Sequence, residues 1–310
     1  MKIRANGIDI EVEDSAAAQA PDAGAASRPV VLLIMGLGMQ LVAWPPELVQ
    51  ALVDAGFRVI RMDNRDAGLS QTFDHLGTPN LLWAGLQYKL GLVPRAPYTL
   101  TDMAADALGV LDALGVARAH VVGASMGGMV AQRVAIAAPQ RTLSLTSIMS
   151  SSGAKGLPQA RREVVRALLR RPASRQPQAV VDHFVQLFRA IGSPAYPTPE
   201  PELRARILEG VQRSFHPAGT ARQMLAILSD VTRAAQLARI SSPTLVLHGR
   251  ADPLVPYAHG EDTARRIAGA QLVGIEGMGH DLPPEPVAQM LAALIPHLQA
   301  AGQPAPARPL

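Results

Sequence analysis

Short, continuously apolar runs recur along the chain, and stretches with helical spacing of apolar residues separate them. An apolar run bounded by turn residues is typical of a strand that is buried on both faces of a sheet. The runs lie at 29–35, 57–62, 119–122, 143–149, 243–248 and 271–275. The helical spacing predicts helices at about 46–55, 101–114, 126–138, 258–268 and 286–299. This alternation predicts the α/β class, with a mostly parallel central sheet and helices on both of its faces.

The segments outside this alternation are also informative. Residues 3–13 alternate around Asn6-Gly7, which predicts a strand or hairpin. Residues 15–29 are rich in Ala, with Pro, Gly and Ser, and predict a loose surface loop. Residues 71–97 form an insertion with mixed signals, and the Pro/Ala-rich residues 300–310 predict a disordered tail.

One long segment interrupts the strands between the fourth and fifth buried runs. Residues 153–239 contain no strand-like run, follow a helical pattern and are broken by several prolines. The segment is too long for a connection and has too few strands for a second α/β domain. We therefore predict an α/β core over 1–152 and 240–303, a helical cap over 153–239 and a disordered tail over 304–310.

Composition narrows the possible chemistry. The 310 residues include no cysteine, which excludes disulfides, thiolate nucleophiles, Cys-ligated zinc and iron–sulfur clusters. The net charge of +4 comes mostly from arginine, and one cluster, at 161, 162, 166, 170 and 171, is interpreted as a solvated helix face. No aromatic residues interleave this cluster, so we expect no nucleic-acid partner. Residues 1–7 lack an apolar leader and 30–35 are too few to span a bilayer, so we expect a cytoplasmic protein with no membrane partner.

The strongest chemical signal is Gly123-Ala124-Ser125-Met126-Gly127, between a predicted strand and a predicted helix. This is the pattern of a nucleophile elbow, in which a serine occupies a sharp, strained turn and the glycines let neighbouring backbone approach. The N–H of Met126 begins the helix, so it is a free donor at the positive end of the helix dipole. A second donor is expected from the loop after an earlier central strand, where Leu37 is the candidate.

A serine nucleophile needs a general base and a group that orients the base. His280 lies in Gly277-Met278-Gly279-His280-Asp281-Leu282-Pro283, after the last predicted strand, and Asp252 follows the strand before it. The order Ser125, Asp252, His280, each after a strand, is the order expected of an α/β-hydrolase. His248 ends a strand and is assigned a structural role. We expect the walls of the substrate site to include Met35, Gly36, Trp44, Met129, Phe215 and Leu282, although core packing is the commoner role of such side chains.

The chain resembles the α/β-hydrolase superfamily over nearly its whole length. Several motifs resemble the aclacinomycin methylesterase branch in particular: Met35-Gly36, Trp44-Pro45, Asp63-Asn64-Arg65-Asp66-Ala67-Gly68-Leu69-Ser70, Tyr98-Thr99-Leu100-Thr101-Asp102-Met103, His216-Pro217-Ala218-Gly219-Thr220-Ala221-Arg222-Gln223 and the segment around His280. The resemblance implies a cofactor-free carboxylic-ester hydrolase with a helical cap and with oxyanion donors at Leu37 and Met126. Many superfamily members have His-Gly where this chain has Met35-Gly36, which makes the predicted pocket floor more apolar.

These patterns predict a serine hydrolase that cleaves a small to medium apolar ester through an acyl-enzyme, without cofactor or metal. A carbon–carbon bond hydrolase acting on a diketone is the nearest alternative, and haloperoxidase activity is a weaker one. Epoxide and haloalkane hydrolysis are disfavoured because they need a carboxylate at the position of Ser125. A hydrolase-like protein that only binds a small ligand under the cap remains the alternative outside catalysis.

Overall fold

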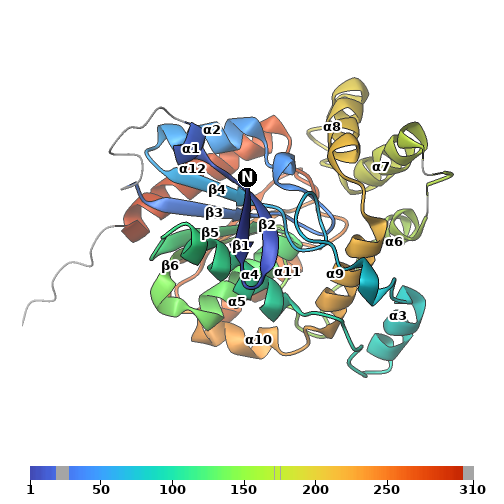
Figure 1. Cartoon of the computed structure of the whole chain (residues 1–310), viewed down its shortest axis with the longest axis horizontal. Coiled ribbons are helices and arrows are strands. Elements are labelled where there is room, and N and C mark those ends of the chain that lie inside the picture. Colours follow the sequence, from blue (N-terminus) through green and yellow to red (C-terminus); the bar gives the residue numbers. More distant parts are fainter. Residues whose placement is uncertain (19–27, 171, 175, 303–310) are drawn as a thin grey trace, which may run out of the picture.

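The computed structural model describes residues 1–18, 28–170, 172–174 and 176–302, and an eight-stranded sheet runs through its centre (Figure 1). The strand order is β1-β2-β4-β3-β5-β6-β7-β8. The pairs β1–β2 and β2–β4 are antiparallel, whereas every pair from β4 to β8 is parallel. The strands are β1 (Lys2–Ala5), β2 (Ile8–Asp14), β3 (Val30–Ile34), β4 (Arg58–Met62), β5 (Ala119–Ala124), β6 (Thr142–Ile148), β7 (Thr244–Gly249) and β8 (Gln271–Ile275).

Helices pack around the sheet and extend beyond one of its ends (Figure 1). In the described residues the α-helices are α1 (Ser15–Ala18), α2 (Pro46–Asp54), α3 (Leu81–Lys89), α4 (Leu100–Ala113), α5 (Met126–Ala137), α6 (Arg162–Leu169), α7 (Pro177–Ile191), α8 (Glu200–Arg213), α9 (Pro217–Ser229), α10 (Arg233–Gln236), α11 (Ala258–Arg266) and α12 (Pro284–Gly302). Short 3-10 helices are η2 (Leu41–Ala43), η3 (Asp74–Leu76), η4 (Pro139–Arg141) and η5 (Leu237–Arg239). The predicted α/β class is confirmed.

Alternation along the central strands divides the core into two layers. In β3, Leu32 and Ile34 belong to the apolar cluster under α4 and α5, which we call the first core cluster. Val31 and Leu33 belong to the cluster under α2 and α12, the second core cluster. Successive side chains of a strand point to opposite faces, so a strand between two helix layers must be apolar at every position.

Two local predictions at the chain ends need correction. Residues 15–18 form α1 rather than a loop, because Asp14 Oδ1 accepts the N–H of Ala16 and the Ser15 hydroxyl accepts the N–H of Val59. Residues 300–302 continue α12 rather than starting a disordered tail, and Leu298, one turn earlier, is buried in the second core cluster. The remainder of the predicted loop, 19–27, and the predicted tail, 304–310, lie outside the described residues. The hairpin at Asn6-Gly7 is confirmed, and both residues have the positive φ of a tight hairpin turn.

Residues 153–239, which we call the cap segment, contribute helices and no strand within their described parts. The segment contacts loops that follow several strands of the sheet, including β3, β7 and β8. The N–H of Arg161 donates to the carbonyl of Pro253 after β7, at 2.9 Å, and the N–H of His280 after β8 donates to the carbonyl of Ile191, at 2.7 Å. The N–H of Gly38 after β3 donates to the side chain of Gln223. The cap segment therefore lies over the carboxyl ends of the parallel strands.

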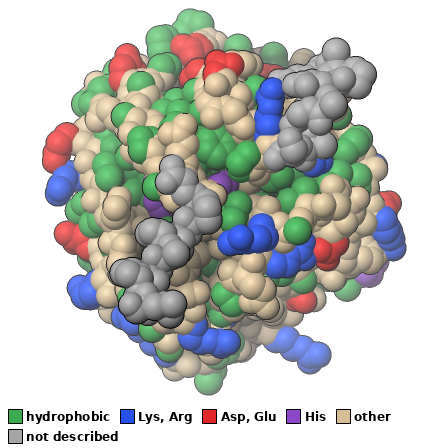
Figure 2. Space-filling view, turned by 90° about the vertical axis from the view of Figure 1, so that its left-hand side faces the viewer, with side chains coloured by type: hydrophobic (Ala, Val, Ile, Leu, Met, Phe, Trp, Pro, Cys, Tyr) green, Lys and Arg blue, Asp and Glu red, His purple; other side chains and the backbone are tan. Residues whose placement is uncertain are grey.

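The insertion at 71–97 contains η3 and α3. α3 packs on α9 and has one buried residue, Ala84. Leu82 and Trp83 of α3, and Leu90 directly after it, are exposed to solvent. In the described residues, no helix combines the length and the apolar character that a membrane span requires. On the face shown in Figure 2, basic and acidic side chains are both scattered over the surface.

Candidate active site

A sharp turn between β5 and α5 carries Ser125. Its φ of 55° and ψ of −120° place it in a region that residues with a Cβ atom rarely occupy. A Cβ atom on Gly123 would lie 2.1 Å from the carbonyl oxygen of Gly127, and one on Gly127 would lie 2.0 Å from that of Ile34. Both glycines are therefore needed for strand and helix to meet this closely. The turn leaves Ser125 at the carboxyl end of a central strand, where open α/β sheets bind ligands.

His280 connects Ser125 with Asp252. Its Nε2 lies 3.0 Å from Oγ of Ser125, and its Nδ1 lies 2.7 Å from Oδ2 of Asp252. The other carboxylate oxygen, Oδ1, accepts the backbone N–H groups of Leu254 and Val255 at 2.9 and 2.8 Å. A carboxylate held in this way accepts a hydrogen bond from the Nδ1–H of His280. The Nε2 atom then carries no proton and can accept one from the Ser125 hydroxyl. The sheet thus brings together three side chains that are far apart in sequence.

A second histidine, His248, lies beside Asp252. His248 is fully buried, and its Nε2 donates to the carbonyl of Val255 at 2.7 Å and lies 3.6 Å from Oδ2 of Asp252. Burial lowers the pKa of His248, so its ring stays neutral. Since Nε2 of this ring is occupied by Val255, His280 is the ring that bridges Asp252 and Ser125.

Two backbone N–H groups near Ser125 are free donors. In the described part of the chain, the N–H groups of Leu37 and Met126 have no hydrogen-bond partner. Met126 is the first residue of α5, where a helix leaves its N–H unpaired. Leu37 lies in a turn, and the preceding Gly36 approaches Ser125 so closely that a Cβ atom on it would lie 3.2 Å from Cβ of Ser125. Two such donors can bind a developing oxyanion.

The side chains that were predicted to line a substrate site pack in different parts of the protein. Met129 belongs to the first core cluster, whereas Met35 and the fully buried Trp44 belong to the second. Leu282 is partly exposed and packs against the second cluster, and Phe215 packs edge-on against Phe184 of α7, with ring centroids 6.2 Å apart. All of these contacts are with other side chains of the protein, so binding of substrate by these residues stays a prediction.

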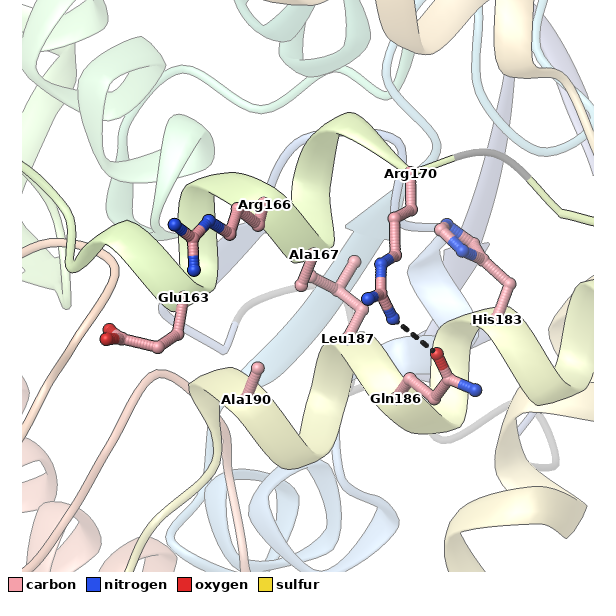
Figure 3. A pocket seen from close by; sticks show the side chains of 8 residues that line it. All are labelled: Glu163, Arg166, Ala167, Arg170, His183, Gln186, Leu187 and Ala190. Carbon is pink, nitrogen blue, oxygen red and sulfur yellow. Dashed lines mark hydrogen bonds between the residues drawn. The ribbon is translucent and has the colours of Figure 1, made fainter.

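A cavity of about 300 Å³ lies between α6 and α7, away from these groups (Figure 3). Its lining residues include Arg166 of α6, Arg170 directly after that helix, and His183 and Leu187 of α7. Arg170 donates to Gln186 within it, at 3.3 Å. Neither Ser125, Asp252 nor His280 lines this cavity, so it is separate from the hydrogen-bonded chain of the three residues.

The sequence interpretation did not assign roles to several side chains that surround the site. Asn64 donates to the carbonyl of Met35 at 2.8 Å, and Gln223 accepts the N–H of Gly38 at 2.8 Å. Both residues occur in motifs that carry the family resemblance, which was the available signal, but a buried amide in a motif does not reveal its partner.

For a metal, the described residues offer no group of three or more His, Asp or Glu side chains that could hold one.

Comparisons with known proteins agree with this architecture. Residues 29–286 match the family model of the alpha/beta hydrolase fold. The chain is 32% identical over 294 residues to rhodomycin D methylesterase DauP of Streptomyces sp. (strain C5), covering 87% of this chain and 91% of that protein. It superposes on the enol-lactonase from Burkholderia xenovorans LB400 with a TM-score of 0.71 and 24% identity, over 96% of this chain and all of the other. It superposes on the meta-cleavage product hydrolase CumD from Pseudomonas fluorescens IP01 with a TM-score of 0.73 and 18% identity, over 97% and 98% of the two chains. This chain therefore belongs to the α/β-hydrolase family and is a hydrolase.

Proposed function

We propose that this hydrolase cleaves a small to medium apolar carboxylic ester through an acyl-enzyme. The observation that carries the proposal is the chain of two hydrogen bonds, 3.0 Å from Ser125 to His280 and 2.7 Å from His280 to Asp252. The 32% identity to a protein named as a methylesterase supports an ester, rather than another electrophile, as the substrate.

The residues have distinct roles in the proposed reaction. Oγ of Ser125 attacks the ester carbonyl while Nε2 of His280 takes the hydroxyl proton. The N–H groups of Leu37 and Met126 donate to the oxyanion of the tetrahedral intermediate. His280 then passes its proton to the leaving alcohol, and in the second half it activates a water molecule that hydrolyses the acyl-enzyme. Asp252 holds the ring of His280 and stabilises its charged form.

We further propose that the cap segment covers the core formed by 1–152 and 240–303 and shapes the site for the substrate. Its contacts with the loops after β3, β7 and β8 support this division, because those loops carry Leu37, Asp252 and His280. Closing such a segment over a nucleophile excludes water and selects substrates by shape.

The test is active-site labelling combined with turnover. A fluorophosphonate should add to Ser125, located by mass after proteolysis, and esters of graded acyl length should be hydrolysed. Ser125→Ala should remove labelling and turnover, with a residual rate of about 10³–10⁴ over the uncatalysed reaction at most. The matched control Ser229→Ala, on α9, removes a hydroxyl that donates to the carbonyl of Ala226 and should retain both activities. Cleavage of a diketone but not of any ester would replace the proposal with carbon–carbon hydrolysis. If the protein is not labelled and turns over no substrate, it has only a binding role.

A further inference from the structure

Each of the three peptide groups in the turn that carries Leu37 takes part in one hydrogen bond, and none of these bonds uses the Leu37 N–H. The carbonyl of Met35 accepts from Asn64 Nδ2 at 2.8 Å, and the carbonyl of Gly36 accepts the N–H of Met39 at 3.2 Å. A trans peptide places its N–H opposite to its C=O. The bond from Met39 to Gly36 therefore fixes the direction of the Leu37 N–H, the free donor beside Ser125.

The third of these peptide groups is held from the cap segment. The N–H of Gly38 donates to Oε1 of Gln223, on α9, at 2.8 Å, across 185 residues of sequence. Nε2 of the same side chain donates to the carbonyl of Arg65 at 2.7 Å. A backbone N–H can only donate and a carbonyl can only accept, so these partners fix which end of the amide is oxygen. Gln223 is fully buried, and both ends of its amide are used.

The peptide that Gln223 holds is the one most able to rotate. Leu37 and Gly38 are the central residues of the turn, and Gly38 has φ +65°, which is typical of a turn whose central peptide is flipped relative to the commonest type. Reversal of this peptide requires the Gly38 N–H to leave its acceptor. α9 also approaches Gly38 so closely that a Cβ atom there would lie 2.6 Å from Oγ1 of Thr220.

We propose that Gln223 is a positioning residue for the oxyanion site: by holding the Leu37–Gly38 peptide it keeps the turn in place, so that the Leu37 N–H, whose direction the bond from Met39 to Gly36 sets, stays at the reacting carbonyl oxygen. This inference rests on the proposed esterase function and on the donor role of Leu37 within it. It extends the role of the cap segment, because a residue of α9 then supports the chemistry as well as the choice of substrate. Gln223 acts through the turn and does not touch the substrate.

The test replaces Gln223 by the nearly isosteric Met, which can neither accept from Gly38 nor donate to Arg65. We expect kcat for a short activated ester to fall about 10- to 100-fold, since misplaced donors cost rates of this order. KM should change by less than about threefold, because the oxyanion forms only after binding. The inhibition constant of a trifluoromethyl ketone, whose adduct with Ser125 carries the same oxyanion, should rise by the same factor as kcat/KM falls.

The control is Gln40→Met. Gln40 is also a buried amide that joins the core to the cap segment, through the carbonyls of Gly210 and Ser214, but its side chain forms no hydrogen bond with Gly38. Its loss should lower the melting temperature as Gln223→Met does while leaving kcat within about threefold of wild type. If both variants lose kcat equally, loosening of the cap segment explains the effect and the inference is wrong.

A second variant keeps the inference testable if Gln223→Met does not fold. Gly38→Ala adds a Cβ atom 2.6 Å from Thr220 Oγ1 and should show the same selective loss of kcat, whereas Gly210→Ala on α8 meets only Gln40 Nε2, at 3.8 Å, and should not. Wild-type kcat in either Gln223→Met or Gly38→Ala overturns the inference. If the wild-type protein itself is not labelled at Ser125, the proposed function fails first, and the two failures are thereby distinguished.

Discussion

The backbone N–H of His280 donates a hydrogen bond of 2.7 Å to the carbonyl oxygen of Ile191, the last residue of α7. The end of a cap helix thus holds the residue that we propose as general base. The hydroxyl of Ser193 extends this contact by accepting the N–H of Gly279 at 2.9 Å and donating to Asp281. The position of the imidazole therefore depends on close packing between this loop and the end of α7.

Gly279→Ala should separate these two segments. A Cβ atom on Gly279 would lie 2.3 Å from the carbonyl oxygen of Gly192 and 2.6 Å from that of Ile191, so the loop must shift. We expect kcat to fall about 100-fold through displacement of His280 and the free energy of unfolding to fall by about 1–3 kcal/mol. Ester turnover and urea denaturation measure the two effects. Gly85→Ala in α3, where a Cβ atom meets nothing within 4 Å, is the control and should change neither by much.

Arg222→Met should destabilise the protein strongly. Arg222 is fully buried and donates from Nε and Nη2 to the carboxylate of Asp66 at 2.8 and 2.7 Å. Removal of Arg222 leaves the carboxylate of Asp66 buried without its countercharge, although Tyr98 and Phe73 still donate to it, and such a loss costs about 3–5 kcal/mol. Denaturant unfolding measures the loss. Arg206→Met removes an exposed pair with Glu202, four residues earlier on α8, and should cost at most about 1 kcal/mol. Equal losses in the two variants would show that burial of the Asp66 pair contributes nothing extra.

His120 should make stability depend on pH. Burial, with smaller contributions from His297 and Arg118, lowers the pKa of His120 from 6.5 to about 4. Between pH 6.5 and about 4, His120 is protonated in the unfolded chain but mostly neutral in the folded chain. Its contribution to the free energy of unfolding is therefore complete above pH 6.5 and is lost as the pH falls towards 4. The interval corresponds to about 3 kcal/mol in the free energy of unfolding.

Comparison with His120→Gln isolates this group from others that titrate in acid. Glutamine is neutral throughout and retains a polar group facing the Ser144 hydroxyl, which lies 2.8 Å from Nδ1 of His120. The difference in unfolding free energy between wild type and variant should shrink by up to about 3 kcal/mol from pH 7 to pH 4. A difference that stays constant over this range would mean that His120 does not titrate as described.

Phe215→Ala should change which esters are preferred. Phe215 lies between α8 and α9 and packs edge-on against Phe184, so its truncation opens apolar space in the cap segment. We expect kcat/KM for long-acyl relative to short-acyl esters to change by about 10- to 200-fold, while the smallest activated ester reacts nearly as before. Leu203→Ala removes apolar volume around the third core cluster of Val181, Val185 and Ile207 and serves as the control. An equal effect of both variants on all substrates would assign Phe215 to packing alone.

Local patterns in the sequence were sufficient for the sheet and for the turn at Ser125. Each apolar run became a strand because a strand between two helix layers has no polar face. The Gly-x-Ser-x-Gly turn has a local sequence signature, although Gly127 is needed because of its approach to Ile34 on the neighbouring strand. The candidates Asp252 and His280 could be chosen from their order after successive strands, because parallel strands carry their following loops to the same edge of the sheet. Their proximity, at 2.7 Å, is a property of the folded chain.

Contacts between distant segments were decided only by the tertiary structure. The extra turn at 15–18 forms because Val59 donates to Ser15, and a loop-like composition cannot reveal that partner. The same is true of the Gln223 side chain, which accepts the N–H of Gly38, and of the Ile191 carbonyl, which accepts the N–H of His280. A buried amide or carbonyl carries no periodic signal, since its role depends on which donor or acceptor the fold places within about 3 Å of it. Local patterns therefore predict the sheet, the strained serine and the order of the reactive side chains. The orientation of the groups around Ser125 depends on hydrogen bonds between distant segments, including those that the cap segment makes with Gly38 and His280.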